Sequence, residues 1–303
     1  FYSQLILFLP KSVYNWEKEY SLWEEKEMRN FDYSHLKNRT WDNEILSYVA
    51  KIHEFKGKQE LYFRQKPVEL ERLVEIAKVQ STESSNRIEG IVTTRFRLQQ
   101  LVEDKTTPRN RDEKEILGYR NVLNLIHENY QYIPLKSNYI LQLHRDLLQY
   151  TELSYGGKYK TSPNEIDAVL PNGEKNILFK PLEPYETPDA IEQICSSYQQ
   201  ALDCEIVDSL ILIPCVILDF LCVHPFNDGN GRMSRLLTLL LFYKAGYIVG
   251  KYISIEMLIE KTKDTYYDAL QASSEGWHEG TNDYAPFVSY TLGIIKSAYK
   301  TFS

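Results

Sequence analysis

The chain has 303 residues, 43% of them apolar, which suffices for one large or two closely packed helical domains with a substantial core. The formal net charge of −7 and the isoelectric point near 5.5, without a basic stripe, argue against general binding to nucleic acid. The four cysteines lack the Cys-x-x-Cys spacing that binds metal, and we expect reduced, buried thiols of a cytoplasmic protein; they are Cys195, Cys204, Cys215 and Cys222.

Residues 1 to about 40 are aromatic and charged, and we expect one or two helices there, packed on the body of the protein. Their aromatic residues include Tyr14, Trp16, Tyr20 and Trp23. The apolar residues 5–9 lack the basic start and the small-residue cleavage site of a signal peptide. Residues 210–223 are too short, and too interrupted by Pro214 and Asp219, to span a membrane. We therefore expect no membrane partner.

Residues 41 to about 130 are predicted to be helical, with a polar break near residues 104–112. Apolar residues recur on one helical face from residue 70 toward residue 88, and Gly90 is a suitable place for that helix to end. The residues of this face are Leu70, Leu73, Val74, Ala77 and Ile88. Taken by itself, Glu89 is best interpreted as a solvent-facing helical acid.

Residues 164–179 contain two short β-prone runs around Asn172-Gly173, which is the strongest short-range signal of a β-hairpin. A lone hairpin is not stable in water, so this one must pack on the helices. The pattern alone is also compatible with a merely decorative surface hairpin.

The most informative segment runs from His224 to Arg235 and reads His-Pro-Phe-Asn-Asp-Gly-Asn-Gly-Arg-Met-Ser-Arg. Apolar stretches at residues 210–223 and 236–242 flank it, so we expect it on the turn between two core helices. A loop between such helices is held rigidly enough to carry chemistry. The sequence has no Gly-x-x-x-x-Gly-Lys-Ser/Thr stretch, so this segment is not a P-loop.

The glycine-rich turn in this segment is typical of a phosphate site. Gly229, Asn230 and Gly231 can point successive backbone N–H groups at one spot, and the helix that follows adds the positive end of its dipole. Arg232 and Arg235 are three residues apart and therefore share one face of that helix. Cations are disfavoured at a helix N-terminus unless an anion lies there too.

Two further side chains suggest chemistry at the same turn. Asp228 is a hard oxygen donor suited to Mg²⁺ that also contacts substrate phosphates. His224 is a candidate general base near neutral pH. Each feature alone has an ordinary structural interpretation, but their joint occurrence within twelve residues favours a nucleotide-phosphate site with a base beside it.

The segment matches the signature His-Pro-Phe-x-Asp/Glu-Gly-Asn-Gly-Arg-x-x-Arg of the Fic ("filamentation induced by cyclic AMP") family at every defined position. The resemblance extends from roughly residue 40 to about residue 290. It implies an all-α fold, with a Fic-type helical core and a small β-hairpin flap. It also implies transfer of AMP from Mg-ATP, with ATP and Mg²⁺ as the cofactors, to a Ser, Thr or Tyr hydroxyl of a target protein.

The resemblance assigns a role to most residues of the segment. His224 would deprotonate the target hydroxyl, and Asp228 would hold Mg²⁺. The nucleotide would be bound by Gly229, Asn230, Gly231, Arg232 and Arg235, with Arg235 on the γ-phosphate. Phe226 is similar to the apolar anchor of the loop. Residues 264–270 resemble the helix that borders the nucleotide base, and there Tyr267 is the expected contact; its neighbour Tyr266 faces another way and can belong to the core.

Residues 85–90 resemble the Ser/Thr-x-x-x-Glu-Gly/Asn pattern that marks an inhibitory helix in many Fic proteins. Here Glu89 would take Arg235 in a charge-assisted pair, so that the arginine could no longer hold the γ-phosphate. Because the pattern precedes the core in the same chain, the resemblance implies inhibition in cis.

The resemblance also implies that a target segment adds itself to the hairpin as an extra strand. One departure precedes the hairpin: where the family often has Gly-x-x-Arg, this chain reads Gly157-Lys158-Tyr159-Lys160, which keeps the charge but loses the planar fork. A protein target on the flap is the expected partner. The 23 tyrosines also allow self-modification, and the oligomeric state is open.

These expectations divide the chain into an N-terminal helical region with the inhibitory helix (1–130), a Fic core with flap and active-site loop (131–250), and C-terminal helices packed on the core (251–303). The favoured activity is that of an autoinhibited protein adenylyltransferase. One alternative is a phosphodiesterase that removes AMP from a modified target at the same site. Another is a nucleotide-responsive binding module without turnover. A kinase-like variant is disfavoured because Gly-Asn-Gly-Arg is intact.

Overall fold

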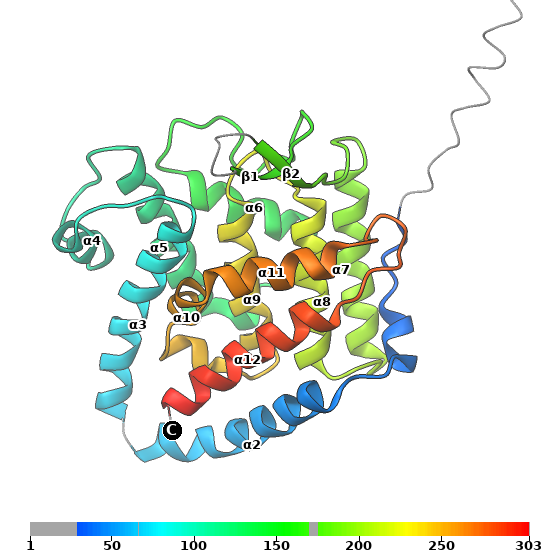
Figure 1. Cartoon of the computed structure of the whole chain (residues 1–303). Coiled ribbons are helices and arrows are strands. Elements are labelled where there is room, and N and C mark those ends of the chain that lie inside the picture. The colour runs from blue at the N-terminus through cyan, green and yellow to red at the C-terminus, as the bar shows by residue number, and fades with distance from the viewer. Residues whose placement is uncertain (1–28, 66, 170–174, 303) are drawn as a thin grey trace, which may run out of the picture.

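The computed structural model describes residues 29–65, 67–169 and 175–302, and helices make up most of them (Figure 1). The structure confirms a mostly helical fold with a small β-hairpin. The elements are η1 (Tyr33–Asn38), α2 (Asn43–Gln65), α3 (Pro67–Ile88), α4 (Arg95–Val102), α5 (Arg111–Asn129), η2 (Tyr130–Tyr132), α6 (Ser137–Leu148), β1 (Ile166–Val169), β2 (Lys175–Phe179), α7 (Thr187–Asp203), α8 (Ser209–Val223), α9 (Asn230–Lys244), η3 (Ile248–Lys251), α10 (Ile255–Lys261), α11 (Lys263–Ser274) and α12 (Ala285–Phe302).

Helix α8 forms the centre of the molecule because, apart from Asp219, it is apolar on every side. Each of its residues from Leu210 to Val223 is buried, and a helix without a polar face must be surrounded by other elements. It contacts α7, α9, α11 and α12. Figure 1 shows α7, α8 and α9 side by side, with α11 and α12 crossing in front of them. The short connection between α8 and α9 is therefore fixed at both ends in the core.

Helix α3 ends where the sequence predicted. Gly90 has a φ of +78°, and the amide of Ile91 donates to the carbonyl of Asn86 at 3.0 Å, which terminates the helix. The C-terminal half of α3 buries small polar residues rather than leucines: Ser81, Thr82, Ser84, Ser85 and Asn86. It packs on α5 and α10. The apolar pattern predicted this helix. It did not predict that the last turns of α3 pack on their neighbours through small polar residues.

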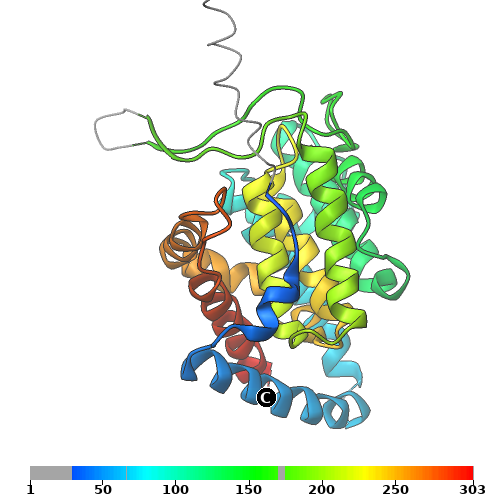
Figure 2. The ribbon, with the colours of Figure 1, turned by 90° about the vertical axis from the view of Figure 1, so that its right-hand side faces the viewer.

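The β-hairpin is antiparallel, and its register is irregular between Ile166 and Asp167, which pair with Phe179 and Ile177. Figure 2 shows the two strands extending away from the helical body. The ring of Phe179 contacts the buried Trp277 edge-on, with centroids 5.9 Å apart, and this contact holds the base of the hairpin on the core. The predicted turn at residues 172–173 lies outside the described residues.

The buried carboxylate of Asp219 joins the N-terminal segment to α8. It accepts hydrogen bonds from the hydroxyls of Tyr33 and Tyr284 and from the indole N–H of Trp277, at 2.7 to 3.1 Å. Burial raises the pKa of Asp219, although Arg29 and these donors oppose the shift. Of the helices predicted within residues 1–40, the described part contains the 3-10 helix η1 rather than an α-helix. The predicted aromatic residues Tyr14, Trp16, Tyr20 and Trp23 lie outside the described residues.

The prediction of buried cysteines is right for Cys195, Cys215 and Cys222, and burial raises the pKa of each thiol. It is wrong for Cys204, which is exposed because it follows the last residue of α7. No helix in the described part of the chain is long and apolar enough to cross a membrane.

Candidate functional site

His224 ends α8 in a strained backbone conformation. Its φ of 49° and ψ of 62° lie in the left-handed region, which residues other than glycine seldom adopt outside sites where the structure enforces it. The His224 amide donates to the Phe220 carbonyl at 3.0 Å. The ring Nδ1 lies 3.3 Å from the Leu221 carbonyl oxygen. Since a carbonyl only accepts, Nδ1 carries the proton and Nε2 has the free lone pair.

The surroundings of His224 keep this imidazole neutral. Burial lowers its pKa to about 4, and the nearby charge of Lys160 acts in the same direction. The carboxylates of Glu89 and Asp228 oppose the shift only in part. His224 is therefore in its basic form at neutral pH, with Nε2 available to accept a proton.

Phe226, the expected apolar anchor, follows His224 in the loop. Its ring is fully buried and stacks on the His144 ring, with centroids 3.7 Å apart and planes inclined by 8°. The side-chain amide of Asn230 closes the loop: its Oδ1 accepts from the Phe226 amide at 2.9 Å, and its Nδ2 donates to the Phe226 carbonyl at 2.8 Å. The Asn230 side chain is thus occupied, which leaves its main-chain N–H as the group able to contact phosphate.

Two glycines allow close approach to this loop. Gly229 has a φ of +84° and precedes the first residue of α9, so the free N–H groups of the first helical turn lie beside the loop. A Cβ at Gly231 would overlap with the carboxylate of Glu89. The end of α3 therefore lies directly against the N-terminus of α9, the part of the loop predicted to bind phosphate.

Arg235 is held by the end of α3. One of its terminal nitrogens lies 2.7 Å from Oε1 of Glu89, its Nε donates to the Ser85 hydroxyl at 2.8 Å, and a third bond reaches the Ser85 carbonyl at 3.0 Å. The guanidinium is buried, whereas 34% of the Glu89 side chain is exposed. Burial alone would raise the pKa of Glu89, but the charge and hydrogen bond of Arg235, together with the charge of Arg232, outweigh it, so the pKa is lowered and Glu89 is ionised. The predicted contact between Glu89 and Arg235 is thus present.

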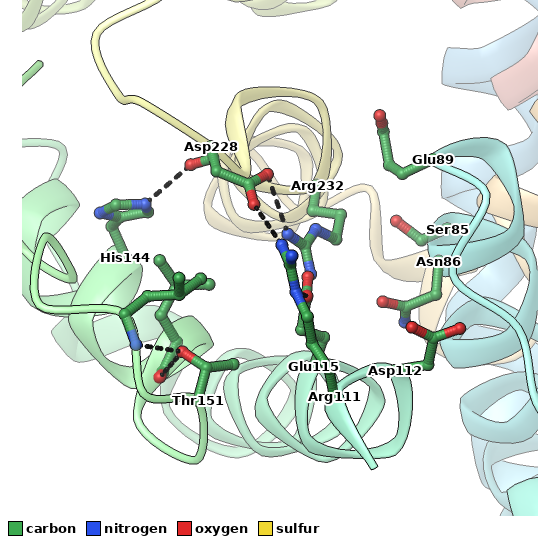
Figure 3. Close-up of polar contacts among 12 residues, drawn as sticks. Ser85, Asn86, Glu89, Arg111, Asp112, Glu115, His144, Thr151, Asp228 and Arg232 are labelled. Atoms are coloured by element: carbon green, nitrogen blue, oxygen red, sulfur yellow. Dashed lines mark hydrogen bonds and ion pairs between the residues drawn. The ribbon is translucent and has the colours of Figure 1, made fainter.

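Asp228 and Arg232 belong to a charged cluster with two residues of α5 (Figure 3). Arg232 is buried and pairs with Glu115 at 2.7 Å and with Asp228 at 3.3 Å. Arg111 donates its Nε to Glu115 at 2.7 Å and places a terminal nitrogen 3.4 Å from Asp228. Sequence reasoning missed Glu115 and Arg111: their spacing of four indicates a pair on one helical face, but nothing in it points to a loop more than 100 residues away.

The donor set at Asp228 is compatible with Mg²⁺. Within residues 29–65, 67–169 and 175–302, no group of three or more His, Cys, Asp or Glu side chains could hold a metal. Mg²⁺ does not need such a group, since it is usually held by one or two carboxylates together with waters and substrate phosphates. The partly exposed carboxylate of Asp228 meets this requirement.

A second set of polar contacts fixes the main chain around His224. Asn164 donates its side-chain N–H to the carbonyls of His224 and Phe226, at 3.2 and 3.1 Å. The ammonium of Lys160 donates to Asn164 at 2.8 Å and to the Val223 carbonyl at 3.1 Å. Burial lowers the pKa of Lys160 to about 8. The lysine that departs from the family pattern therefore contacts the carbonyl of the last residue of α8 directly and reaches the loop through Asn164, which was not predicted.

The two adjacent tyrosines of α11 face different ways, as the sequence indicated. Tyr266 is buried in the core, whereas 40% of Tyr267 is exposed. Tyr267 borders a small apolar pocket between the hairpin, α8 and α11, together with Leu178, Phe179 and Leu221. Burial raises the pKa of Tyr267, and the charge of Glu89 adds to the shift. This tyrosine therefore lies within electrostatic range of the Glu89–Arg235 pair.

The sequence of this chain is similar to that of known Fic proteins. Residues 134–242 match the model of the Fic/DOC family. The chain is 27% identical over 236 residues to "Protein adenylyltransferase Fic" of Culex quinquefasciatus, covering 73% of this chain and 41% of that protein. It is 30% identical over 189 residues to the protein of the same name from Aedes aegypti, covering 59% of this chain and 32% of that protein. The chain thus spans less than half the length of these relatives.

Among solved structures, a Fic family protein of Desulfovibrio desulfuricans superposes with a TM-score of 0.69 at 20% identity, covering 87% of this chain and 75% of that one. A Fic domain-containing signalling protein of Bacteroides thetaiotaomicron gives a TM-score of 0.66 at 23% identity, covering 85% and 95%. At these identities the likeness shows a shared fold.

Proposed function

We propose that this chain, whose residues 134–242 match the Fic/DOC family and whose fold is the mostly helical Fic fold, is a protein adenylyltransferase whose resting state is inhibited by Glu89. The observation that carries the proposal is the neutral His224 beside a glycine loop whose Arg235 is already paired with an acid. The names of its distant relatives support the same activity.

In the proposed reaction, Nε2 of His224 takes the proton of a target hydroxyl while that oxygen attacks the α-phosphorus of ATP. The bond between the α-phosphorus and the bridging oxygen breaks, and pyrophosphate leaves. The target then carries AMP, and His224 carries the proton until solvent removes it. A base that is neutral at pH 7 suits this step, and the Nδ1 contact with Leu221 supplies the required tautomer.

The loop and its arginines would bind the phosphates. The amides at the start of α9 and the side chains of Arg232 and Arg235 provide donors around one spot. Asp228 would hold Mg²⁺, which stabilises negative charge on phosphate oxygens when bound. Tyr267 would border the base or ribose. Phe226 and Asn230 would keep the loop in shape.

Inhibition would follow from competition for Arg235. While Glu89 holds the guanidinium, a γ-phosphate meets a carboxylate in place of a free cation, and ATP binds weakly or in an unreactive pose. Release of Glu89 frees the arginine. A target protein would present its hydroxyl by pairing with the β-hairpin, as an added strand beside the loop.

The test is transfer of labelled AMP from Mg-ATP to proteins of a cell lysate, or to the chain itself. Glu89→Gly should raise transfer at least tenfold, because it frees Arg235. Adding His224→Ala should abolish transfer while leaving ATP binding within about twofold, since the imidazole acts on the hydroxyl. Undiminished transfer in the double variant would refute His224 as the base, and a Glu89→Gly variant no more active than wild type would refute the inhibition.

Removal of AMP from a modified target is a second candidate, because Glu89 is ionised and a third of it is exposed beside the loop. A water oriented by this carboxylate could attack the phosphorus of a bound AMP-protein. Incubating wild type and Glu89→Gly with an AMP-modified protein separates the activities: release by the wild type alone would favour removal. ATP binding by Glu89→Gly without transfer or release would favour a binding module instead.

A further inference from the structure

Arg111 is the exposed cation of the cluster at Asp228. Its side chain, the first of α5, is 65% exposed, and it reaches Asp228 from α5, whereas α3 lies to one side of the loop (Figure 3). Arg232, the other guanidinium at Asp228, is almost fully buried. The two arginines are tied to the same carboxylate of Glu115, one to each oxygen. Glu115 therefore sets the position of both.

The two arginines differ in their freedom to move. Arg232 is enclosed and paired with buried Glu115 at 2.7 Å, so its displacement would leave a buried charge without a partner. Arg111 keeps only its Nε on Glu115, and its terminal nitrogens face solvent and Asp228. Its contact with Asp228, at 3.4 Å, is longer than a good charge-assisted hydrogen bond. Only Arg111 can change acceptor at little cost.

Binding of a divalent cation to Asp228 would change the balance of charge at this cluster. The carboxylate oxygen that faces Arg111 would then face a dication, which repels the guanidinium. Phosphate oxygens arrive at the same place with the metal and are the strongest acceptors within reach of a side chain that stays anchored at Nε. Arg111 would thus exchange Asp228 for phosphate without leaving Glu115.

We propose that Arg111 is a phosphate-binding residue of the nucleotide site, which donates to the metal-bound β-phosphate while Glu115 positions it. The proposal rests on the function proposed above, since it requires a nucleotide at the loop. Arg111 would approach the phosphates from α5, and Arg235 would approach from the side of α3.

The experiment compares binding of ADP and AMP, with Mg²⁺ present, by calorimetry in the Glu89→Gly background. Arg111→Ala should weaken ADP about tenfold, the loss expected for one charge-assisted contact to phosphate. AMP lacks the β-phosphate and should lose no more than about twofold. The matched control is Lys114→Ala, which removes a cation from the same turn of α5 but contacts Glu152; it should bind ADP as the parent does.

The possible results distinguish failure of the Arg111 proposal from failure of the proposed function. Equal ADP affinity with and without Arg111, or equal losses for ADP and AMP, would overturn the proposal. Failure of the Glu89→Gly parent itself to bind ADP would instead refute the proposed function. Arg111→Lys keeps the charge without the planar fork and should lose part of the ADP affinity, which tests the contact independently should the alanine variant prove less stable.

Discussion

At the scale of single residues, the site depends on groups whose charge is set by burial and by neighbouring charges. His224 is neutral because it is removed from water, and Glu89 is ionised because Arg235 lies beside it. Both pKa values are shifted downward from the ordinary ones. The pH range in which His224 is neutral and Glu89 is ionised therefore extends below about 6.5, the ordinary pKa of a histidine, so the proposed base and the proposed inhibitory acid keep the same charge states across neutral pH.

The pH dependence of AMP transfer tests the state of His224. In Glu89→Gly, kcat/KM should change less than about twofold from pH 8 to pH 5, because the pKa of His224 is about 4 through burial. Removing Glu89 takes away a charge that raises this pKa, so the acid limb moves further from neutrality. A histidine with its ordinary pKa would lose about thirtyfold over the same range. A loss of that size, from initial rates at saturating Mg²⁺, would contradict the neutral base.

At the scale of elements, the last turns of α3 are joined to the protein by polar contacts. Ser85 and Glu89 hold Arg235, and Asn86 accepts the amide that ends the helix. The hydroxyl of Thr82 and the side-chain oxygen of Asn86 are buried without a hydrogen-bond partner among the described residues. Unpaired buried polar groups weaken packing. The segment that would inhibit the site is therefore held less firmly than a leucine-lined helix.

Loosening the end of α3 should raise activity. Gly90→Ala places a Cβ on a residue with φ of +78°, where no neighbouring atom lies within 4 Å, so the cost is backbone strain of about 1 kcal/mol. Gly280→Ala introduces the same strain at φ of +68°, also in open space, but away from the site. Both should lower the melting temperature slightly, and only Gly90→Ala should increase AMP transfer. Equal AMP transfer by the two variants would contradict the proposed role of the end of α3 in inhibition.

The sequence predicted those elements whose signals are local. The apolar face from residue 70 to residue 88, the apolar stretch before His224 and the Asn-Gly pair each define an element without knowledge of its neighbours. The contact of Glu89 with Arg235 was predicted only because a family pattern joined two segments 146 residues apart. No local pattern links Glu115 to Arg232, or Asn164 to the His224 carbonyl, since these contacts arise when α5 and the hairpin base pack on the α8–α9 loop.

At the scale of the whole molecule, three histidines are buried in neutral form. Burial lowers the pKa of His127 to about 3 and the pKa values of His144 and His224 to about 4. His127 lies away from the site, against the hydroxyl of Tyr243. In the unfolded chain all three would take up protons below a pH of about 6.5. The unfolded state then binds more protons than the native state, so stability is full above pH 6.5 and falls toward pH 4.

Urea unfolding at pH 7 and pH 5 measures this effect. The wild-type midpoint should be lower at pH 5, a range in which ordinary carboxylates are still mostly ionised. His127→Gln removes one titrating group and should show a smaller difference between the two pH values, whatever its stability at pH 7. Identical shifts for the two proteins would mean that His127 takes up its proton in the native state.

The space beside Gly231 would be used by two different groups, the Glu89 carboxylate and a polyphosphate. In the resting molecule the Glu89 carboxylate occupies the space that any side chain at this position would fill, and in the proposed working molecule a polyphosphate would need the same opening. Under the proposed function, a bulkier residue at position 231 would displace the Glu89 carboxylate and would also block the polyphosphate, so it would abolish AMP transfer. Substitution of Glu89 would instead activate transfer, although the two positions are neighbours in space.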